Sequence, residues 1–398
     1  MYRVGQKEID AIAEVLLSGE LFRYHKGGQC ERFERRYAKF LGVKHVCMTS
    51  SGTTALTAAL AGLGVGPGDE VLVPACTYMA TAVSVVAAGA IPVVVDVDET
   101  ITLDPRAVAA AIGPQTRAVI PVHMWGLPCD MAALMRVARK HKLLVIEDAC
   151  QGVGGAYEGR MLGSIGHAGA FSFNYYKNMT CGEGGAVVTN DDRVAQRARC
   201  MVDCCSFYWT GRKQDMVPFT SNGSRASEIE GAMLNVQLDR IGPIIRALRR
   251  QKARILRETA ETGLKATPSN SPDHECGSHV MYTLASESQA DRFARLAGGT
   301  VCAKTGRHIY TEWDPIFAHQ GAQHPALNPF NLPQNRRCRS KYTRDMCARS
   351  LEILNRTVMI GTHPDRKRAD VTNVIRRIRD AARQVLEPAA PSTSRAGQ

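Results

Sequence analysis

The sequence contains no long uninterrupted run of apolar residues. Charged residues interrupt segment 1–20, which therefore lacks the apolar stretch of a signal peptide. No other apolar run reaches the ~20 residues that a helix needs to span a bilayer. These absences argue against secretion and membrane insertion, and we expect a cytoplasmic protein.

The sequence also has too little charge for a disordered chain. Of its 398 residues, 44% are apolar and only 22% are charged, which is enough apolar material for a large core. The formal net charge is +12, but many arginines fall in helical patterns such as segment 246–254, where they form a solvated helix face. No zinc-finger or RNA-recognition signature accompanies the charge, so we predict no nucleic-acid partner.

A disulfide framework is not indicated, although the chain has thirteen cysteines. They are scattered, and several, such as Cys47, lie in apolar strand-like runs, so we predict reduced and mostly buried thiols. His274, Cys276 and His279 lie close together in a polar segment. Because a fourth ligand is missing, we predict an ordinary loop there and no metal site.

Seven short apolar runs between residues 45 and 190 have the composition of β-strands. In order, they are HVCM, EVLVPA, IPVVVDVD, RAVIPVHM, LLVIEDA, GAFSF and GAVVTN. Helical patterns separate the earlier runs, and strands apolar on both faces are typical of a parallel sheet covered by helices. The last two runs are joined by a loop too short for a crossover helix, which predicts one antiparallel strand. The predicted fold class is α/β, with a large, mostly parallel, seven-stranded mixed sheet.

Helical periodicity dominates the sequence after Ser227. A long amphipathic pattern begins there, and we predict that Gly242 and Pro243 interrupt it, since proline cannot continue the hydrogen-bond ladder. Further helical patterns cover residues 342–355 and 371–385, among short strands and loops.

These patterns divide the chain into two domains and a tail. We expect an N-terminal segment plus a large α/β domain over residues 1–250 and a smaller C-terminal α+β domain over residues 251–387. Residues 388–398 are rich in proline, serine and alanine, which predicts disorder.

A small polar turn leads from a strand into a helix at residues 49–54 (TSSGTT). Hydroxyl groups and free backbone N–H groups at a helix N-terminus suit a phosphate. Taken alone, the pattern is more often an ordinary helix cap.

Asp148 closes a hydrophobic strand, at the edge where ligands bind in open α/β sheets. It is either a turn or capping residue, or a buried anion that pairs with a protonated ring nitrogen.

Lys177 lies between an apolar strand and the glycine-rich turn 182–185. A lysine there is either a surface charge or, if desolvated, a Schiff-base former. Together the turn, the acid and the lysine supply anchoring, electronic tuning and covalent attachment for one cofactor.

The chain resembles the DegT/DnrJ/StrS sugar aminotransferases, a branch of the fold-type I pyridoxal-phosphate enzymes. The matching motifs are SSGTTAL, VPACTYMATA, VHMWGLPCDM, IEDACQ and FSFNYYKNMTCGEGGAVVTN, and the similarity continues to about residue 385. The resemblance implies pyridoxal 5'-phosphate as cofactor, cycling with pyridoxamine 5'-phosphate. It also implies transfer of an amino group from L-glutamate or L-glutamine to a keto or aldehyde group of a sugar-like intermediate in amino-sugar or antibiotic biosynthesis. A homodimer with active sites at the subunit interface is implied as well.

The resemblance assigns roles to individual residues. Lys177 would carry the cofactor as a Schiff base, and Asp148 would bind its pyridine nitrogen. The other implied cofactor-binding residues are Ser51, Gly52, Thr53 and Ser172 at the phosphate, Tyr78 against the ring, Gln151 near the 3-hydroxyl, and Asn222 of the neighbouring subunit at the phosphate. Asn222 lies one residue out of the family's Asn-x-Arg-x-x-Glu pattern, and its contact depends on the flexibility of Gly223.

The substrate contacts are less defined. Segment 22–24 (Phe-Arg-Tyr) and the pair at 123–124 (His-Met) are similar to the subgroup that aminates 8-oxo-3-deoxy-octulosonate to the 8-amino-3,8-dideoxy sugar. Arg23 would then bind a substrate carboxylate, unless it is an ordinary loop arginine. The candidate substrate contacts are Arg23, Tyr24, His308 and Tyr310. In the alternative interpretation, His308 and Tyr310 simply pack.

Two other functions fit the same motifs. One is a dehydratase of the same family, although its sugar dehydratases carry histidine where this chain has Lys177; an aromatizing dehydratase keeps the lysine. The other is a non-catalytic, cofactor-binding regulator, which would be expected to lose Lys177 or Asp148.

Overall fold

A computed structural model describes residues 4–209, 211 and 215–386 of the chain. At its centre lies a seven-stranded sheet in the order β1-β9-β8-β5-β4-β2-β3. Its strands are β1 (His45–Thr49), β2 (Glu70–Pro74), β3 (Ile91–Val95), β4 (Thr116–Val119), β5 (Leu144–Asp148), β8 (Ala168–Ser172) and β9 (Gly185–Thr189). All seven predicted strands are confirmed. β9 is antiparallel to both of its neighbours, which confirms the single antiparallel strand.

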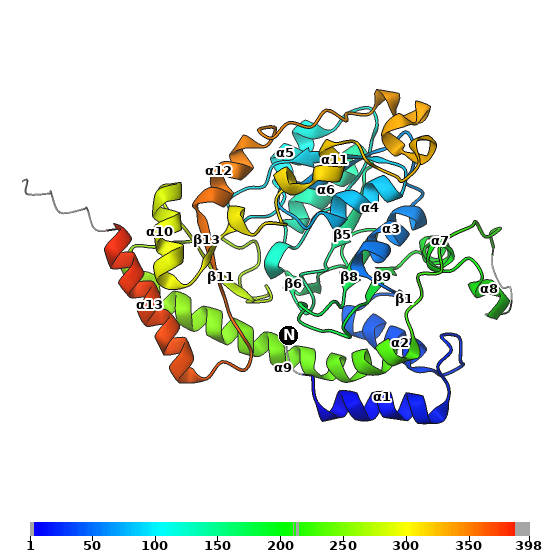
Figure 1. The fold of residues 1–398 in the computed structure, drawn as a ribbon, viewed down its shortest axis with the longest axis horizontal. Helices are drawn as coiled ribbons and strands as arrows, with labels where there is room; N and C mark the ends of the chain where they lie inside the picture. Colours follow the sequence, from blue (N-terminus) through cyan, green and yellow to red (C-terminus); the bar gives the residue numbers. More distant parts are fainter. Residues whose placement is uncertain (1–3, 210, 212–214, 387–398) are drawn as a thin grey trace, which may run out of the picture.

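Both faces of this sheet are covered by helices, as Figure 1 shows. One hydrophobic cluster includes residues of α3 (Gly52–Gly62), α4 (Ala80–Ala87) and α7 (Asp192–Val202). The cluster on the other face includes residues of α2 (Gln29–Leu41), α5 (Pro105–Ala111), α6 (Met131–His141) and α9 (Glu228–Thr259). Along β2, Val71 and Val73 belong to the first cluster and Leu72 to the second. The strand side chains thus point alternately into two cores, which explains why the runs are apolar throughout.

The prediction that Gly242 and Pro243 interrupt the long helix is wrong. α9 is one helix of 32 residues with Pro243 inside it. Pro243 is exposed, whereas its neighbours Ile241 and Ile244 are buried. The proline removes one hydrogen-bond donor on the solvent side, while apolar burial on the other side maintains the helix. The predicted domain boundary at residues 250/251 therefore lies within α9.

A second, four-stranded antiparallel sheet lies at the far end of α9 (Figure 1). Its order is β10 (Lys265–Ala266), β11 (His279–Thr283), β13 (Thr357–Gly361) and β12 (Thr300–Val301). α10 (Glu287–Ala297), α13 (Arg368–Leu386) and the end of α9 enclose a third hydrophobic cluster with it. This separate core supports the proposed two-domain division. The predicted tail 388–398 lies outside the described residues.

Two helices near the C-terminus have bounds that differ from the predicted ones. α12 (Ala348–Arg356) begins six residues after the predicted start at 342, because Tyr342 instead packs back on the large sheet and donates to Pro92 O at 2.8 Å. α13 covers the predicted helix 371–385 and begins earlier, at Arg368. A short hairpin of β6 (Ala156–Tyr157) and β7 (Arg160–Met161) was not predicted.

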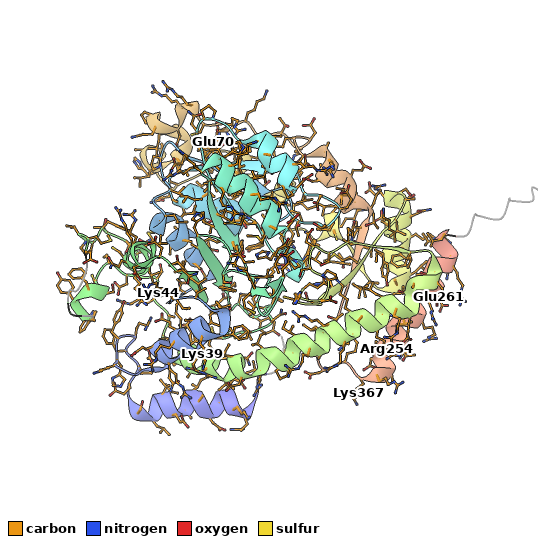
Figure 2. The ribbon with its side chains drawn as sticks, turned by 180° about the vertical axis from the view of Figure 1, so that it is seen from behind. Lys39, Lys44, Glu70, Arg254, Glu261 and Lys367 are labelled. Carbon is orange, nitrogen blue, oxygen red and sulfur yellow. The ribbon has the colours of Figure 1, made fainter. Side chains whose placement is uncertain are left out.

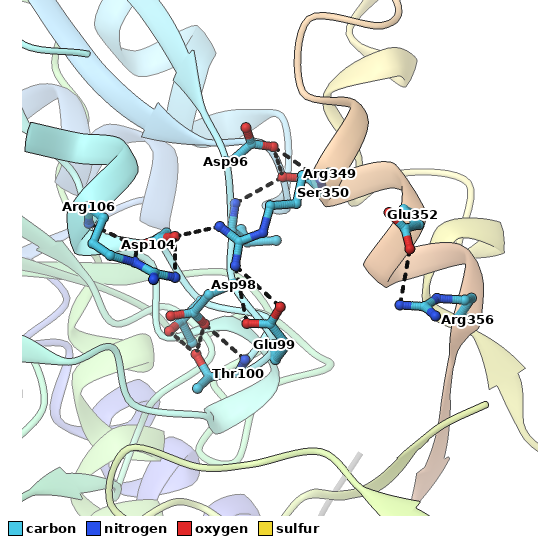
Figure 3. A network of polar contacts seen from close by, with 12 residues as sticks. Asp96, Asp98, Glu99, Thr100, Asp104, Arg106, Arg349, Ser350, Glu352 and Arg356 are labelled. Atoms are coloured by element: carbon cyan, nitrogen blue, oxygen red, sulfur yellow. Dashed lines mark hydrogen bonds and ion pairs between the residues drawn. The ribbon is translucent and has the colours of Figure 1, made fainter. Parts of the chain in front are cut away.

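Ion pairs attach the C-terminal part of the chain to the large sheet. Glu70, labelled in Figure 2, accepts from Arg339 Nη2 at 2.5 Å. Figure 3 shows a second network, in which Arg349 Nη1 donates to Asp104 Oδ2 at 2.7 Å and Ser350 Oγ donates to Asp96 Oδ1 at 2.6 Å. The contacts of Arg349 and Ser350 fix α12 against the edge of the sheet that ends in β3.

All thirteen cysteines are free, and all except Cys150, Cys204 and Cys205 are buried, as predicted. Among the described residues, no helix is both long enough and apolar enough to cross a membrane.

Candidate active site

The candidate site lies at one edge of the large sheet. β1, β5 and β8 run in the same direction, so their carboxyl ends meet there. Asp148 is the last residue of β5, Ser172 the last residue of β8, and Gly52 follows the end of β1. A Cβ atom on Gly52 would lie 2.8 Å from Cys150 Sγ and 2.8 Å from the Ser172 Cβ. The predicted phosphate turn therefore packs directly against the ends of the other two strands.

The turn before α3 has the form of an anion cradle. Ser51 is the N-cap of α3 and accepts from Thr54 N at 3.1 Å, while Thr49 Oγ1 donates to Ser51 O at 2.8 Å. Gly52 and Thr53 are the first two helical residues, whose N–H groups have no acceptor within a helix. Since the side-chain bonds hold the turn in place, these N–H groups are preorganised for a phosphate.

Asp148 is a nearly buried carboxylate, 5% exposed. Its Oδ2 accepts from Thr81 Oγ1 at 2.8 Å, and its Oδ1 accepts from Cys150 N at 3.1 Å. Thr81 Oγ1 in turn lies 2.7 Å from Thr77 Oγ1. A buried carboxylate held by neutral donors is suited to a cationic partner such as a protonated ring nitrogen.

Behind Asp148 lies a buried ion pair that sequence reasoning missed. Glu147 and His123 are both fully buried, with His123 Nε2 3.0 Å from Glu147 Oε2. Burial opposes the imidazolium form, but hydrogen bonds with Cys129 and Glu147 outweigh it and raise the pKa of His123 to about 10. The backbone N–H of His123 also donates to Asp148 O at 3.0 Å. The pair thus fixes the end of the strand that carries Asp148.

Lys177 lies in the loop between β8 and β9, where its N–H donates to Asn174 O at 3.0 Å. Its side chain is half-buried. Burial, and then the charges of Arg307 and Lys177, lower the pKa of His308 to about 4. Burial raises the pKa of the Cys150 thiol, and the charge of Lys177 opposes this rise. The Lys177 amine is therefore electrostatically coupled both to the residue beside the Asp148 carboxylate and to His308.

Gln151 and His308 contact Trp125, a residue that sequence reasoning missed, and Tyr78 lies beside His308. The His308 ring lies 6.0 Å from the ring of Tyr78 and 5.7 Å from that of Trp125, centroid to centroid. Trp125 N donates to Gln151 Oε1 at 3.0 Å. Trp125 has a φ of 51°, a left-handed conformation that costs energy for a bulky residue and is frequent at functional sites. His308 Nδ1 is buried and has no hydrogen-bond partner among the described residues.

Tyr310, by contrast, belongs to the core and not to the candidate site. It is fully buried, and its hydroxyl donates to Arg344 O at 2.5 Å and accepts from Cys347 N at 3.3 Å. The sequence prediction of a substrate contact at Tyr310 is therefore corrected, because its ring is fully buried and its hydroxyl is bonded within the core. Asn222 is exposed on a loop, which is where a contact to a neighbouring subunit requires it.

Arg23 and Tyr24 lie in a cavity whose lining includes neither Lys177 nor Asp148. Arg23 Nη2 pairs with Glu34 Oε1 at 2.5 Å, and Tyr24 donates to Asp203 Oδ2 at 2.7 Å. Within one chain, the structure does not bring these two residues together with the cofactor positions.

Comparison with known proteins gives consistent matches. The model of the DegT/DnrJ/EryC1/StrS aminotransferase family matches residues 3–379 of this chain. GDP-perosamine synthase of Caulobacter vibrioides is 40% identical over 259 residues, which are 63% of this chain and 67% of that protein. The dTDP-3-amino-3,4,6-trideoxy-alpha-D-glucose transaminase of Streptomyces venezuelae is 43% identical over 240 residues, which are 60% of this chain and 61% of that protein.

A solved structure extends the similarity to both sheets. The structure of S. venezuelae DesV in complex with a ketimine intermediate has 29% sequence identity and a TM-score of 0.74. The match covers 96% of this chain and 95% of that chain.

Proposed function

The chain belongs to the DegT/DnrJ/EryC1/StrS aminotransferase family, and on this premise we propose that Lys177 binds the cofactor covalently and transfers the proton of the reaction. The predictions of a fold-type I architecture, of pyridoxal phosphate as cofactor and of a sugar aminotransferase are confirmed. What remains to be proposed is the role of each residue and the nature of the acceptor.

The site fits pyridoxal phosphate. The cradle formed by Ser51, Gly52 and Thr53 suits the phosphate, and Ser172 borders it. The buried carboxylate of Asp148 suits the protonated ring nitrogen. The observation that carries the proposal is the meeting of the cradle and Asp148 at one sheet edge, with Lys177 electrostatically coupled to it.

When bound, the cofactor supplies an electron sink for the Cα–H bond of the amino donor. Asp148 would bind the protonated ring nitrogen through its carboxylate, which the Thr81 hydroxyl holds in place. Lys177 would take the Cα proton of the amino donor on its Nζ amine and hold it for the return step. Gln151 accepts from Trp125 N through Oε1, which leaves its amide N–H groups for the 3-hydroxyl of the cofactor.

We propose L-glutamate or L-glutamine as donor and a keto or aldehyde group of a sugar as acceptor. The sugar substrates in the names of the two relatives support this class. His308 is neutral at physiological pH, and its buried Nδ1 has no partner among the described residues. The half-buried His308 ring lies beside those of Tyr78 and Trp125, where we propose that it contacts the acceptor.

We also propose a homodimer whose subunits share the active site. Tyr176 is 70% exposed beside Lys177, and Leu17 on α1 (Gln6–Ser18) is 88% exposed, so apolar surface is available for a second subunit. Asn222 would reach the cofactor phosphate of the other subunit. The thirteen free cysteines support a cytoplasmic location, where thiols stay reduced.

Absorption spectroscopy of the purified enzyme tests the role of Lys177. We expect a band near ~410–430 nm that L-glutamate converts to one near ~330 nm, as the cofactor passes from its aldehyde to its amine form. Lys177→Ala should abolish the conversion, while Lys140→Ala, at an exposed position at the end of α6, should leave it unchanged. A Lys177→Ala enzyme that still converts the band with glutamate would refute the proposal.

A further inference from the structure

A cavity of about 190 Å³ lies beside the edge strand β1. Its walls come from β1, from α7 and from the loops that carry Arg23 and Arg225, and they include three arginines, of which the third is Arg199. Lys177 and Asp148 do not line it. Within one chain, the cavity is therefore separate from the residues assigned to the cofactor.

Two of the three arginines have a carboxylate partner. Arg23 Nη2 pairs with Glu34 Oε1 at 2.5 Å, and Arg225 Nη1 pairs with Asp203 Oδ2 at 2.9 Å. Both acids are buried, Glu34 with 8% and Asp203 with 4% of its surface exposed. Each of these two carboxylates is therefore already paired, and neither is left to pair with a third cation.

Arg199 is the third cation. Among the described residues, its hydrogen bond is from Nη2 to Val46 O, at 3.3 Å, and no ion pair joins it to an acid. Glu34 contributes to its electrostatics, but the short contact of that carboxylate is to Arg23. Arginine stays protonated at any physiological pH, so it cannot avoid the cost of burial by losing its proton.

The other titratable groups that line the cavity are neutral. Burial raises the pKa of the Cys47 thiol to about 11 and raises that of Cys200 as well. Burial and the hydrogen bond to Asp203 raise the pKa of Tyr24. Three guanidinium groups thus face two carboxylates, and one positive charge is uncompensated.

We propose that this cavity binds one carboxylate group of a small organic acid, with Arg199 as its principal contact. A carboxylate carries the single negative charge that the cavity lacks, and it matches the two parallel donors of a guanidinium. The cavity is too small for a whole nucleotide sugar, since typical ligand pockets measure ~300–1,000 Å³. The proposal does not depend on the roles of Lys177 and Asp148.

Calorimetric titration of the holoenzyme with propionate tests the proposal. Propionate has neither an amino nor an oxo group and so cannot react with the cofactor, and propionamide is its uncharged counterpart. We expect saturable binding of propionate and none of propionamide. Arg199→Met should weaken propionate binding at least tenfold, whereas Arg193→Met, an exposed position on the same helix, should leave it unchanged.

A variant that adds positive charge provides a second test in case Arg199→Met does not fold. Glu34→Gln keeps an acceptor for Met48 N but removes one negative charge, so propionate should bind at least threefold tighter. Equal binding of propionate and propionamide would overturn the proposal. So would unchanged affinity in either Arg199→Met or Glu34→Gln.

Discussion

Replacing Glu147 with glutamine should destabilise the enzyme more than any exchange of an exposed acid. The Glu147 side chain is fully buried, and its carboxylate accepts four hydrogen bonds. The donors are Ile165 N at 2.5 Å and Gly166 N at 2.6 Å on Oε1, and Gly163 N at 2.8 Å and His123 Nε2 at 3.0 Å on Oε2. Each of the two carboxylate oxygens therefore accepts two hydrogen bonds.

A glutamine has only one acceptor oxygen. Its NH₂ group takes the place of one of the two carboxylate oxygens. The two groups that donated to that oxygen then face another donor, and their hydrogen bonds are lost. Each unsatisfied buried donor costs ~1–3 kcal/mol, so the free energy of unfolding should fall by roughly 2–6 kcal/mol.

Urea unfolding of the holoenzyme and the apoenzyme, followed by circular dichroism, measures this loss. Glu14→Gln is the matched control, since Glu14 is exposed on α1. The variant should also release cofactor at lower urea concentration than the wild type, because the backbone of His123 supports Asp148. A loss below about 1 kcal/mol for Glu147→Gln would refute the reasoning, as it is less than one unsatisfied donor costs.

Three further predictions concern the same sheet edge. Gly52→Ala would place a methyl group 2.8 Å from two neighbouring side-chain atoms, so we expect the free energy of unfolding to fall by ~1–3 kcal/mol. Equilibrium dialysis should also show weaker cofactor binding. Gly66→Ala, where the nearest atom lies 3.6 Å away, should change neither quantity. Thr81→Val removes the hydroxyl that donates to Asp148, so cofactor affinity should fall by ~1.5–3 kcal/mol, and an unchanged dissociation constant would contradict this. The pKa of His123 is raised to about 10 from the unfolded value of ~6.5, so its stabilisation is complete below pH ~6.5 and is lost as the pH rises to about 10. Unfolding free energies measured from pH 7 to 10 should therefore decrease in the wild type and decrease less in His123→Gln.

The large sheet was predictable because its strands carry a local signal. Each of the seven runs is short, apolar and bounded by polar or glycine residues, and the short link between β8 and β9 fixes their antiparallel pairing. Because β1, β5 and β8 run in the same direction, their carboxyl ends lie at the same edge of the sheet. The sequence placed Asp148 at such an edge, whereas Ser172 was assigned to the site only through the family resemblance.

The helix through Pro243 was not predictable from a local rule. Proline costs a helix one hydrogen bond, but the burial of isoleucines on the opposite face outweighs that cost, and burial is a property of the folded protein. The strands of β6 and β7, two residues each, are too short to leave a periodic pattern.

Within the site, the sequence could not separate His308 from Tyr310. The two residues are neighbours in an irregular segment, where no periodicity indicates which side chain points inward. The pairing of His123 with Glu147 spans 24 positions of sequence and two strands that are adjacent only in the folded sheet. Trp125 lies in a left-handed conformation that its residue type disfavours, so no propensity predicts it.

The link between β8 and β9 has a consequence for the position of Lys177. Because Lys177 lies in a hairpin connection, both ends of its loop are anchored in adjacent strands of the same sheet. The residues after the lysine are anchored as well, since Met179 is fully buried and Asn178 Nδ2 donates to Val153 O at 3.0 Å. The lysine is thus held by the core itself, and an insertion in this loop would have to leave the buried segment after it undisturbed.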